Sequence, residues 1–389
     1  MINWNDNRGS TMILVIWAIG ILSAIAAFLV YRAEVEWAVM ASLERDLGAR
    51  QLATAVLNER LDLLLADDNA YDTPDEAWYG KTGVSVFERD GYQVRLIIED
   101  EGSKPNINLL GAETWELLLE DKSDIDILLD WIDPDDDPRM EGAEKEHYQS
   151  LSPGYLPRNG FLASLEELKQ LKNGDGLYEM IAPHCTVYGR FNPNTLTREQ
   201  FENLMLSYGI ERRLAERMAE DFSAYRSKNR FENMEQLLQL PSVTLQTLDR
   251  IKPLFEFTGQ CNVNFVGETG LRLTLKRAGY DPGLAAELVS KRREDPFDTM
   301  EEVQAFFRNR RKEIRAEDFF TVRSSVFKIR IWLIKGNHRY YLETVQRRKE
   351  TDRIGIPWEM QVLSWRFLMN EEAPEIPDIV SFGEEENDG

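Results

Sequence analysis

Carboxylates crowd one short stretch of the sequence, LLDWIDPDDDPRMEGAEKEHYQSLSPGY, which begins at Leu128. Its acidic residues are Asp130, Asp133, Asp135, Asp136, Asp137, Glu141, Glu144 and Glu146. Carboxylates held this close repel one another unless a cation lies between them. Ca²⁺ takes about 6–8 oxygen ligands at about 2.3–2.6 Å in flexible loops of this kind, although the spacing here does not match an EF-hand loop. The stretch therefore indicates either a calcium site or a solvated acidic loop.

The sequence offers little else that could do chemistry. It has only three histidines, at His147, His184 and His338, which lie in different segments. It contains no phosphate-binding loop, no nucleophile elbow and no paired-cysteine zinc site. We therefore expect a protein that is not an enzyme. A membrane-anchored, metal-dependent hydrolase that uses the acidic cluster is the alternative within the enzyme class.

Composition excludes some partners. The net charge of −22 and the pI near 4.7 argue against nucleic acid or an anionic membrane surface as the main partner, because like charges repel. The two cysteines, Cys185 and Cys261, are too few for a disulfide-dense scaffold. Outside the cytoplasm they could form one bridge, and the alternative is two separate buried thiols.

An internal repeat organises the middle of the chain. Three stretches open with Asn-x-Asn and continue into a leucine-rich helical segment, at residues 105–110, 192–196 and 261–266. The three units close with similar segments, at residues 161–171, 231–240 and 297–306. Each closing segment carries a capping-box-like pair: Ser164 with Glu167, Asn233 with Gln236, and Thr299 with Glu302. This pattern predicts three related helical units in one α-domain.

Such units resemble helix-hairpin-helix modules, many of which bind DNA backbones. The hairpin positions read SYGIERR, AGYDPGLA and DKSDID, each short of a paired-glycine turn that would aim amides at phosphate. Basic residues at 291–293 and 308–312 are interleaved with acidic ones, which favours a solvated surface. A membrane-tethered DNA receptor remains the second hypothesis.

Strand patterns flank the helical block on both sides. VSVFERDGYQVRLIIED predicts a β-hairpin that turns at Asp90-Gly91. SSVFKIRIWLIKGNHRYYLETVQRR predicts a second pair of strands that turns at Gly336-Asn337. The simplest topology is one sheet with the helical block inserted between its strands, and the alternative is an independent second sheet.

The N-terminus combines a membrane-spanning pattern with an amphipathic one. No charged residue occurs between Met12 and Tyr31, a run long enough to cross a hydrocarbon core of about 30 Å as a helix. An apolar stripe then continues from Val35 to Leu64 among charged residues. We predict one helix from about Met12 to Ala66, with the N-terminus inside. A single-pass anchor followed by a separate stalk is the alternative.

From Arg8 to about Arg347 the chain resembles the K-type minor pseudopilins of the type II secretion system, also called general secretion pathway protein K. The segment LLDWIDPDDDPRMEGAEKEHY is similar to that family's Asp-Trp-Ile-Asp…Gly-Ala-Glu signature. Arg8-Gly9 before the apolar helix resembles a leader cut by prepilin peptidase, which would leave Ser10 as the mature N-terminus, open to methylation. The fifth mature residue is then Leu14, where most pseudopilins have Glu, and this departure is typical of the K type.

The resemblance implies an α+β pseudopilin fold with an inserted α-domain, an inner-membrane anchor and a periplasmic body. It implies structural Ca²⁺ in the α-domain, for which Asp133, Asp135, Asp137 and Glu144 are the expected ligands. It implies a protein that caps the pseudopilus tip and helps to start its assembly for export across the outer membrane. The implied partners are the I-type and J-type minor pseudopilins, other pseudopilus subunits and prepilin peptidase, with no nucleic acid.

The expected organisation is therefore sixfold. The segments are a leader (1–9), a transmembrane and assembly helix (10–66), the first part of the β-domain (67–104), the inserted α-domain (105–318), the second part of the β-domain (319–349) and an acidic flexible tail (350–389).

Overall fold

The computed structural model describes the chain except for residues 1–7, 68, 81–82, 309–314, 354–355 and 376–389. The longer helices are α1 (Arg8–Ala66), α3 (Lys122–Ile132), α5 (Gly174–Ile181), α6 (Arg198–Ser207), α7 (Arg212–Arg226), α8 (Leu245–Ile251), α9 (Glu268–Arg277), α10 (Leu284–Glu294) and α11 (Met300–Phe307). The short helices are α2 (Ala112–Trp115), α4 (Lys145–Gln149) and the 3-10 turns η1 (Glu101–Ser103), η2 (Ile107–Leu109), η3 (Leu165–Gln170), η4 (Met234–Gln239), η5 (Lys252–Leu254), η6 (Ala316–Asp318) and η7 (Asn370–Glu372). The strands are β1 (Val84–Arg89), β2 (Tyr92–Asp100), β3 (Cys261–Asn262), β4 (Phe320–Thr321), β5 (Val326–Lys335), β6 (His338–Arg353) and β7 (Ile356–Met369).

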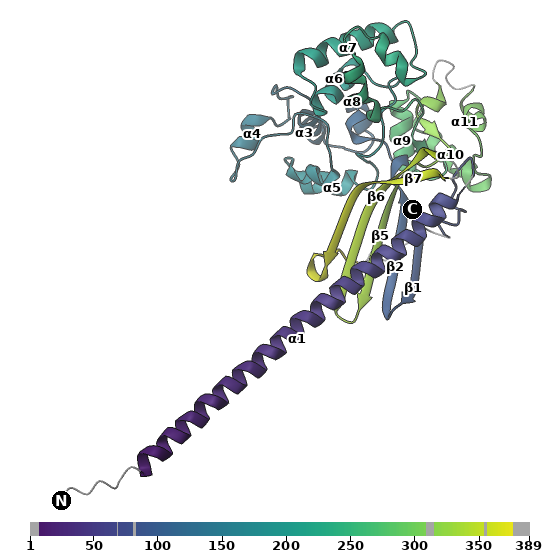
Figure 1. The fold of residues 1–389 in the computed structure, drawn as a ribbon. Coiled ribbons are helices and arrows are strands. Elements are labelled where there is room, and N and C mark those ends of the chain that lie inside the picture. The colour runs from purple at the N-terminus through teal and green to yellow at the C-terminus, as the bar shows by residue number, and fades with distance from the viewer. Residues whose placement is uncertain (1–7, 68, 81–82, 309–314, 354–355, 376–389) are drawn as a thin grey trace, which may run out of the picture.

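One continuous helix, α1, joins the apolar N-terminal run to the folded body, which confirms the predicted long helix. Its apolar residues from Met12 to Tyr31 are exposed, and among the described residues it is the one helix long and apolar enough to cross a membrane. Only its C-terminal part packs on the sheet, through Ala49, Leu52 and Val56 among others. The first half therefore projects away from the body (Figure 1).

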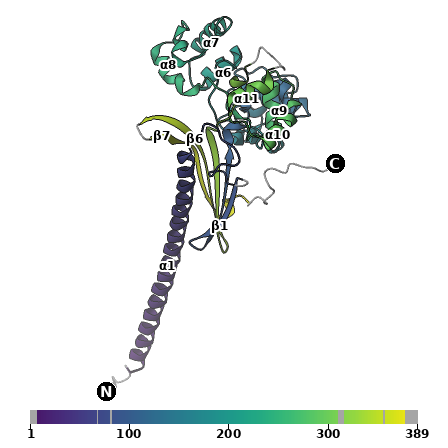
Figure 2. The same cartoon turned by 90° about the vertical axis from the view of Figure 1, so that its right-hand side faces the viewer.

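The sheet has five antiparallel strands in the order β1-β2-β5-β6-β7, which confirms the prediction of one sheet with an inserted block. β2 pairs directly with β5, although more than 220 residues separate them, from Asp100↔Phe327 to Gln93↔Ile334. Asp90 and Gly91 both have positive φ, at 52° and 73°, as a tight two-residue turn requires. The α-domain thus begins and ends at the same end of the sheet (Figures 1 and 2).

The predicted flexible tail from residue 350 is wrong in its first half. β6 continues to Arg353, and β7 pairs with it from Arg353↔Ile356 to Tyr340↔Met369, with a bulge at Val345/Gln346. This bulge breaks the simple alternation of apolar residues along β7, which hid the strand in the sequence. The segment that follows β7 returns over the sheet to β5, where Trp332 Nε1 donates to Pro374 O at 3.3 Å. Residues 376–389 of the predicted tail lie outside the described part.

The second asparagine of each Asn-x-Asn motif ties its unit together. The first asparagine accepts a hydrogen bond from the amide of the second, at 2.9–3.0 Å. The side-chain amide of the second asparagine then binds the backbone of a distant residue, accepting a hydrogen bond from its N–H and donating one to its C=O. These pairs are Asn108 with Leu162, Asn194 with Phe231, and Asn264 with Phe297. The repeat therefore marks three equivalent closures between the opening and the end of a unit.

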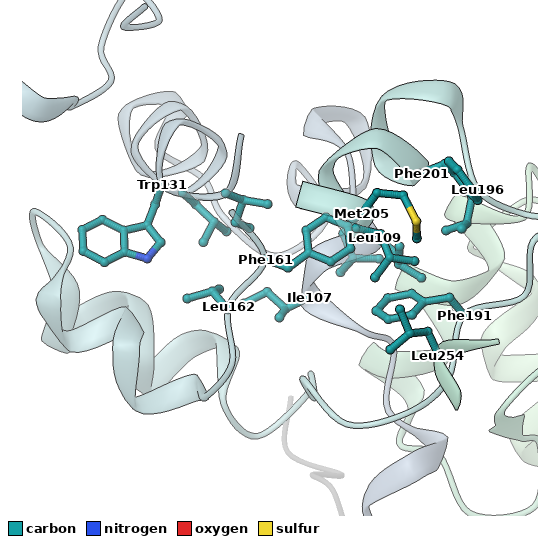
Figure 3. Packing of buried hydrophobic residues seen from close by; sticks show 14 of the residues in the cluster. Ile107, Leu109, Trp131, Phe161, Leu162, Phe191, Leu196, Phe201, Met205 and Leu254 are labelled. Carbon is teal, nitrogen blue, oxygen red and sulfur yellow. The ribbon is translucent and has the colours of Figure 1, made fainter. Parts of the chain in front are cut away.

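All three predicted cap residues cap helices, although two of these are 3-10 turns. Ser164, Asn233 and Thr299 each accept a backbone N–H of the first turn of η3, η4 and α11. The paired side chains, Glu167, Gln236 and Glu302, accept from the amide of the residue before the cap. The units nevertheless do not share one core. The first two bury a common cluster around Phe201, shown in Figure 3, whereas the third has its own around Phe297.

Candidate metal centre

The acidic loop connects α3 to α4 at the edge of the first helical unit. Asp133 is the C-cap of α3, where the backbone turns extended because Pro134 follows. Oxygens of Asp133, Asp135 and Glu144 all lie within 4.8 Å of one another. The structure therefore brings together three of the four predicted ligands. Asp137 lies outside this cluster, and its backbone amide donates to Asp135 Oδ1 at 2.9 Å to close a turn.

Glu144 is the strongest sign that this cluster fits a cation. The side chain is only 5% exposed, and neither carboxylate oxygen has a hydrogen-bond partner. Burial, and then the negative charges of Asp130 and Asp133, raise its pKa to about 8. An orphaned buried carboxylate is costly, and a cation bound to its oxygens would supply the missing partner.

Asp133 also has one carboxylate oxygen that lacks a hydrogen-bond partner. Its Oδ1 is buried without a partner, whereas Oδ2 accepts a hydrogen bond from Arg139 Nη1. Burial raises the pKa of Asp133 to about 6 despite that guanidinium. With Glu144 and Asp135, it presents hard oxygen donors, which suit Ca²⁺ or Mg²⁺ rather than a soft metal.

Asp130 holds the loop in shape from beneath. It is fully buried, and its carboxylate accepts from both the amide and the guanidinium of Arg139. Arg139 thereby bridges Asp130 and Asp133 and offsets part of their repulsion. The sequence indicated a group of acidic residues here but not this division between one supporting carboxylate, Asp130, and the candidate ligands.

Gly142 makes room for this support. A Cβ at Gly142 would lie 1.8 Å from Asp130 Oδ2, which is far inside contact distance. We expect Gly142→Ala to displace Asp130, loosen Arg139 and lower the free energy of unfolding by about 1–3 kcal/mol, as overpacking does. Thermal unfolding with and without Ca²⁺ measures this loss. Gly176→Ala in α5 is the matched control, because a Cβ there meets nothing within 4 Å. Equal stability of the two variants would contradict this role for Gly142.

Asn159 is a further site residue that the sequence analysis missed. Its backbone is left-handed, with φ of 46°, and its Nδ2 donates to Asp135 O at 2.6 Å and to Asp136 Oδ1 at 2.9 Å. Its own Oδ1 is buried without a partner. The Asn159-Gly160 pair, a common turn dipeptide, was the available signal.

Aromatic side chains fasten the two helices that carry the loop. Trp131 of α3 packs edge-on against Tyr148 of α4, with ring centroids 5.1 Å apart, and both are buried. Tyr155 packs against Tyr148 in turn. Figure 3 shows Trp131 at the margin of the core shared by the first two units. This packing brings Glu144 next to Asp133, 11 residues earlier in the chain.

The remaining predicted site residues lie elsewhere. Gly9 and Ser10 lie in the first turn of α1, and Leu14 lies on the same helix with 66% of its surface exposed. Cys185 and Cys261 are free thiols in different cores, so the structure has two separate buried thiols and not the bridge. The three histidines lie apart, in α4, after α5 and at the start of β6.

The basic residues of the third unit are partly used inside the fold. Arg292 Nη1 donates to Val263 O at 2.7 Å and to Val266 O at 2.6 Å, which fixes the third Asn-x-Asn turn. Lys291 pairs with Asp295 at 3.2 Å. Residues 309–312 of the other basic run lie outside the described residues. These contacts favour a structural role over a phosphate-binding one.

Comparison with known proteins gives a consistent set of similarities. A family model described as "Type II secretion system (T2SS), protein K" matches residues 117–190, which include the whole acidic loop. The chain is 25% identical over 239 residues to type II secretion system protein K of Klebsiella pneumoniae, a match covering 54% of this chain and 72% of the relative. It is 26% identical over 212 residues to the putative type II secretion system protein K of Escherichia coli strain K12, covering 47% and 63%.

Among solved structures, one similar chain comes from the crystal structure of the GspK-GspI-GspJ complex from enterotoxigenic Escherichia coli. The superposition has a TM-score of 0.43 with 15% sequence identity, and it covers 84% of this chain and 98% of that chain.

Proposed function

We propose that this chain is a minor pseudopilin of the type II secretion system protein K family, to which its residues 117–190 and two relatives point, and that it caps the tip of a periplasmic pseudopilus and helps to initiate its assembly. The family is a structural, non-enzymatic one. In this proposal α1 anchors the chain in the inner membrane and then packs with the corresponding helices of other subunits. Growth of the pseudopilus below the tip would drive folded proteins through the outer membrane.

The observation that carries the tip position is the placement of the α-domain. It lies at the end of the sheet farthest from the N-terminus of α1, where it would obstruct a further subunit (Figure 1). Leu14 supports the same position. Most pseudopilins have a carboxylate there, which can pair with the N-terminal amine of the subunit above. A subunit with no neighbour above it can do without that charge.

We propose the I-type and J-type minor pseudopilins as partners. The support in this chain is an exposed apolar side of α1 beyond the membrane run, including Val35, Val39, Leu43 and Leu47. Residues at this spacing form one stripe on a helix, and a second amphipathic helix would bury it.

The α6–α7 and α9–α10 pairs, each turning at a glycine with positive φ (Gly209 and Gly279), support reading the inserted units as helix-hairpin-helix-like.

We propose that the acidic cluster binds Ca²⁺ through Asp133, Asp135 and Glu144. The support is the convergence of three carboxylates with an orphaned, buried pair of oxygens on Glu144. Asp137 is not a first choice, because its carboxylate is not among the three that converge. The ion would act structurally, by neutralising and ordering the loop, and would take no part in a reaction.

Processing by prepilin peptidase is the first test of this function. We expect membrane-extracted protein to lose residues 1–9 when it is expressed with the peptidase, so that Ser10 becomes the N-terminus. Intact mass spectrometry, allowing for one methyl group, measures the loss, and expression without the peptidase is the control. A chain that stays uncut beside active peptidase would contradict the pseudopilin assignment and favour a plain membrane anchor.

A further inference from the structure

The second helical unit forms hydrogen bonds to the acidic loop on both sides of Asp133. The carbonyl before Asp133, on Ile132, accepts a hydrogen bond from Asn203 Nδ2 of α6 at 2.6 Å. The carbonyl after it, on Pro134, accepts one from Arg212 Nη2 of α7 at 2.8 Å. Neither Asn203 nor Arg212 is close to the loop in sequence, and neither carries an oxygen in the candidate metal cluster.

These two bonds set where the Asp133 carboxylate lies. Ile132 is the last residue of α3, where backbone carbonyls lack partners within the helix. Asn203 is only 6% exposed, so its bond to Ile132 is shielded from water. With both neighbouring peptide groups held, the backbone of Asp133 has little freedom to rotate away from Asp135 and Glu144.

The segment from Asn159 to Phe161, which contacts the other side of the acidic loop, is also held by the second unit. Asn159 holds Asp135 O, and the chain two residues later is held by Ser207 of α6, whose Oγ accepts from Phe161 N at 2.9 Å. The α6–α7 hairpin thus touches the acidic loop directly at Ile132 and Pro134, and indirectly through the segment that carries Asn159.

We propose that the α6–α7 hairpin controls the affinity of the acidic cluster for calcium, with Asn203 and Arg212 as positioning residues. This inference rests on the calcium site proposed above. Because coupling between two equilibria is reciprocal, calcium must stabilise the docked hairpin by the same factor by which the docked hairpin tightens calcium binding. A partner that moved the hairpin would thereby change calcium occupancy.

Arg212 provides a discriminating test because its two possible effects have opposite signs. As a positive charge near the cluster it repels Ca²⁺, so its removal would tighten binding. As a positioning residue it orders Asp133, so its removal would weaken binding. Arg212 is exposed, and its replacement should leave the fold intact.

The experiment is a calcium titration of the full chain in detergent, comparing wild type with Arg212→Met. We expect about tenfold weaker binding, the loss that corresponds to one hydrogen bond from a charged donor. Arg213→Met is the matched control, since it removes the same charge from the adjacent exposed position in the same helix turn. It should leave affinity unchanged or slightly raised. Asn203→Ala provides a second variant at the other side of Asp133 and should also weaken binding.

Hydrogen exchange supplies a readout that a purely structural role would not move. Calcium should slow amide exchange in α7 of the wild type and of Arg213→Met, and should do so less in Arg212→Met. Unchanged or tighter binding by Arg212→Met would overturn the coupling while leaving the calcium site standing. A wild-type chain that binds no calcium would overturn both proposals.

Discussion

Chelating calcium is expected to lower the melting temperature of the α-domain by about 5–15 °C. A ligand present at about 100–1,000 times its dissociation constant stabilises the folded state by about 2.7–4.1 kcal/mol. For a domain of this size each kcal/mol corresponds to about 2–4 °C. The physical source is the acidic loop, in which Glu144 has two buried oxygens without partners once the ion leaves.

Glu144→Gln makes this prediction specific, because the variant should respond in opposite directions in the two conditions. With calcium it should melt below the wild type, since a ligand charge is lost. Under chelation above about pH 8, where Glu144 is ionised, it should melt at or above the wild type, because a neutral amide replaces a buried carboxylate without donors. Glu141→Gln is the control, as that side chain is exposed in the same loop, and it should change neither temperature much.

The pH dependence of stability should also reveal whether Glu144 is a calcium ligand. Burial raises the pKa of Glu144 from 4.5 to about 8 in the folded protein, so between these values the folded state holds a proton that the unfolded state has released. The metal-free protein should therefore lose stability as the pH rises from about 4.5 to 8. Calcium must displace that proton, so the stabilisation by calcium should grow over the same range. A calcium effect on melting that is equal at pH 6 and pH 8 would contradict Glu144 as a ligand.

Arg348→Met is expected to cost about 3–5 kcal/mol, the typical cost of removing one partner from a buried ion pair. The side chain of Arg348 is 1% exposed. It pairs with Asp72 and, at 3.2 Å, with Asp67, and it donates to Ser324 O at 2.7 Å. Without it, two carboxylates from the segment that follows α1 remain buried at the base of the α-domain.

The effect should reach beyond β6, because this cluster joins several segments. Ser324 N donates to Asp72 Oδ2 at 2.7 Å, and Asn262 of the third Asn-x-Asn motif donates to the Asp72 carbonyl at 3.2 Å. Ser324 Oγ also donates to Asp100 at the end of β2. The cluster around Arg348 and Asp72 therefore connects the end of α1, the sheet and the third helical unit.

Chemical denaturation of the full chain measures this loss. The matched control is Lys349→Met, the next residue on the same strand, whose pair with Glu359 spans 3.7 Å and is about half exposed. Pairs of that kind contribute about 0–1 kcal/mol. Similar losses for both variants would show that burial at position 348 does not govern the energetics of this junction.

Much of the architecture follows from patterns that act over a few residues. The charge-free run from Met12 to Tyr31 determines a membrane-length helix, and Asp90-Gly91 determines a hairpin turn, because both depend on neighbouring residues only. The repeat was equally readable, since Asn-x-Asn and the three caps recur at similar places. The loop's acidity was visible too, and it indicated either a cation site or a solvated acidic loop.

β7 shows where such patterns fail. Its apolar residues recur at every second position from Trp358 to Val362 and again from Leu363 to Phe367, but the bulge shifts the phase between the two runs, so only pairing with β6 reveals one strand. The Asn-x-Asn motifs fail in another way. Their meaning depends on peptide groups 33 to 54 residues away, and sequence spacing does not report which carbonyl lies opposite an amide.

The sequence by itself therefore determined the membrane-length helix, the internal repeat and the acidic loop, and it predicted a hard cation there as one of two alternatives. Tertiary structure decided which carboxylates converge. Asp130 is turned inward to Arg139, Asp137 is held in a turn, and Glu144 is brought to Asp133 by the packing of Tyr148 on Trp131. All are acidic residues of one loop, so composition cannot separate them. Burial and hydrogen bonding do, because these set the cost of each negative charge.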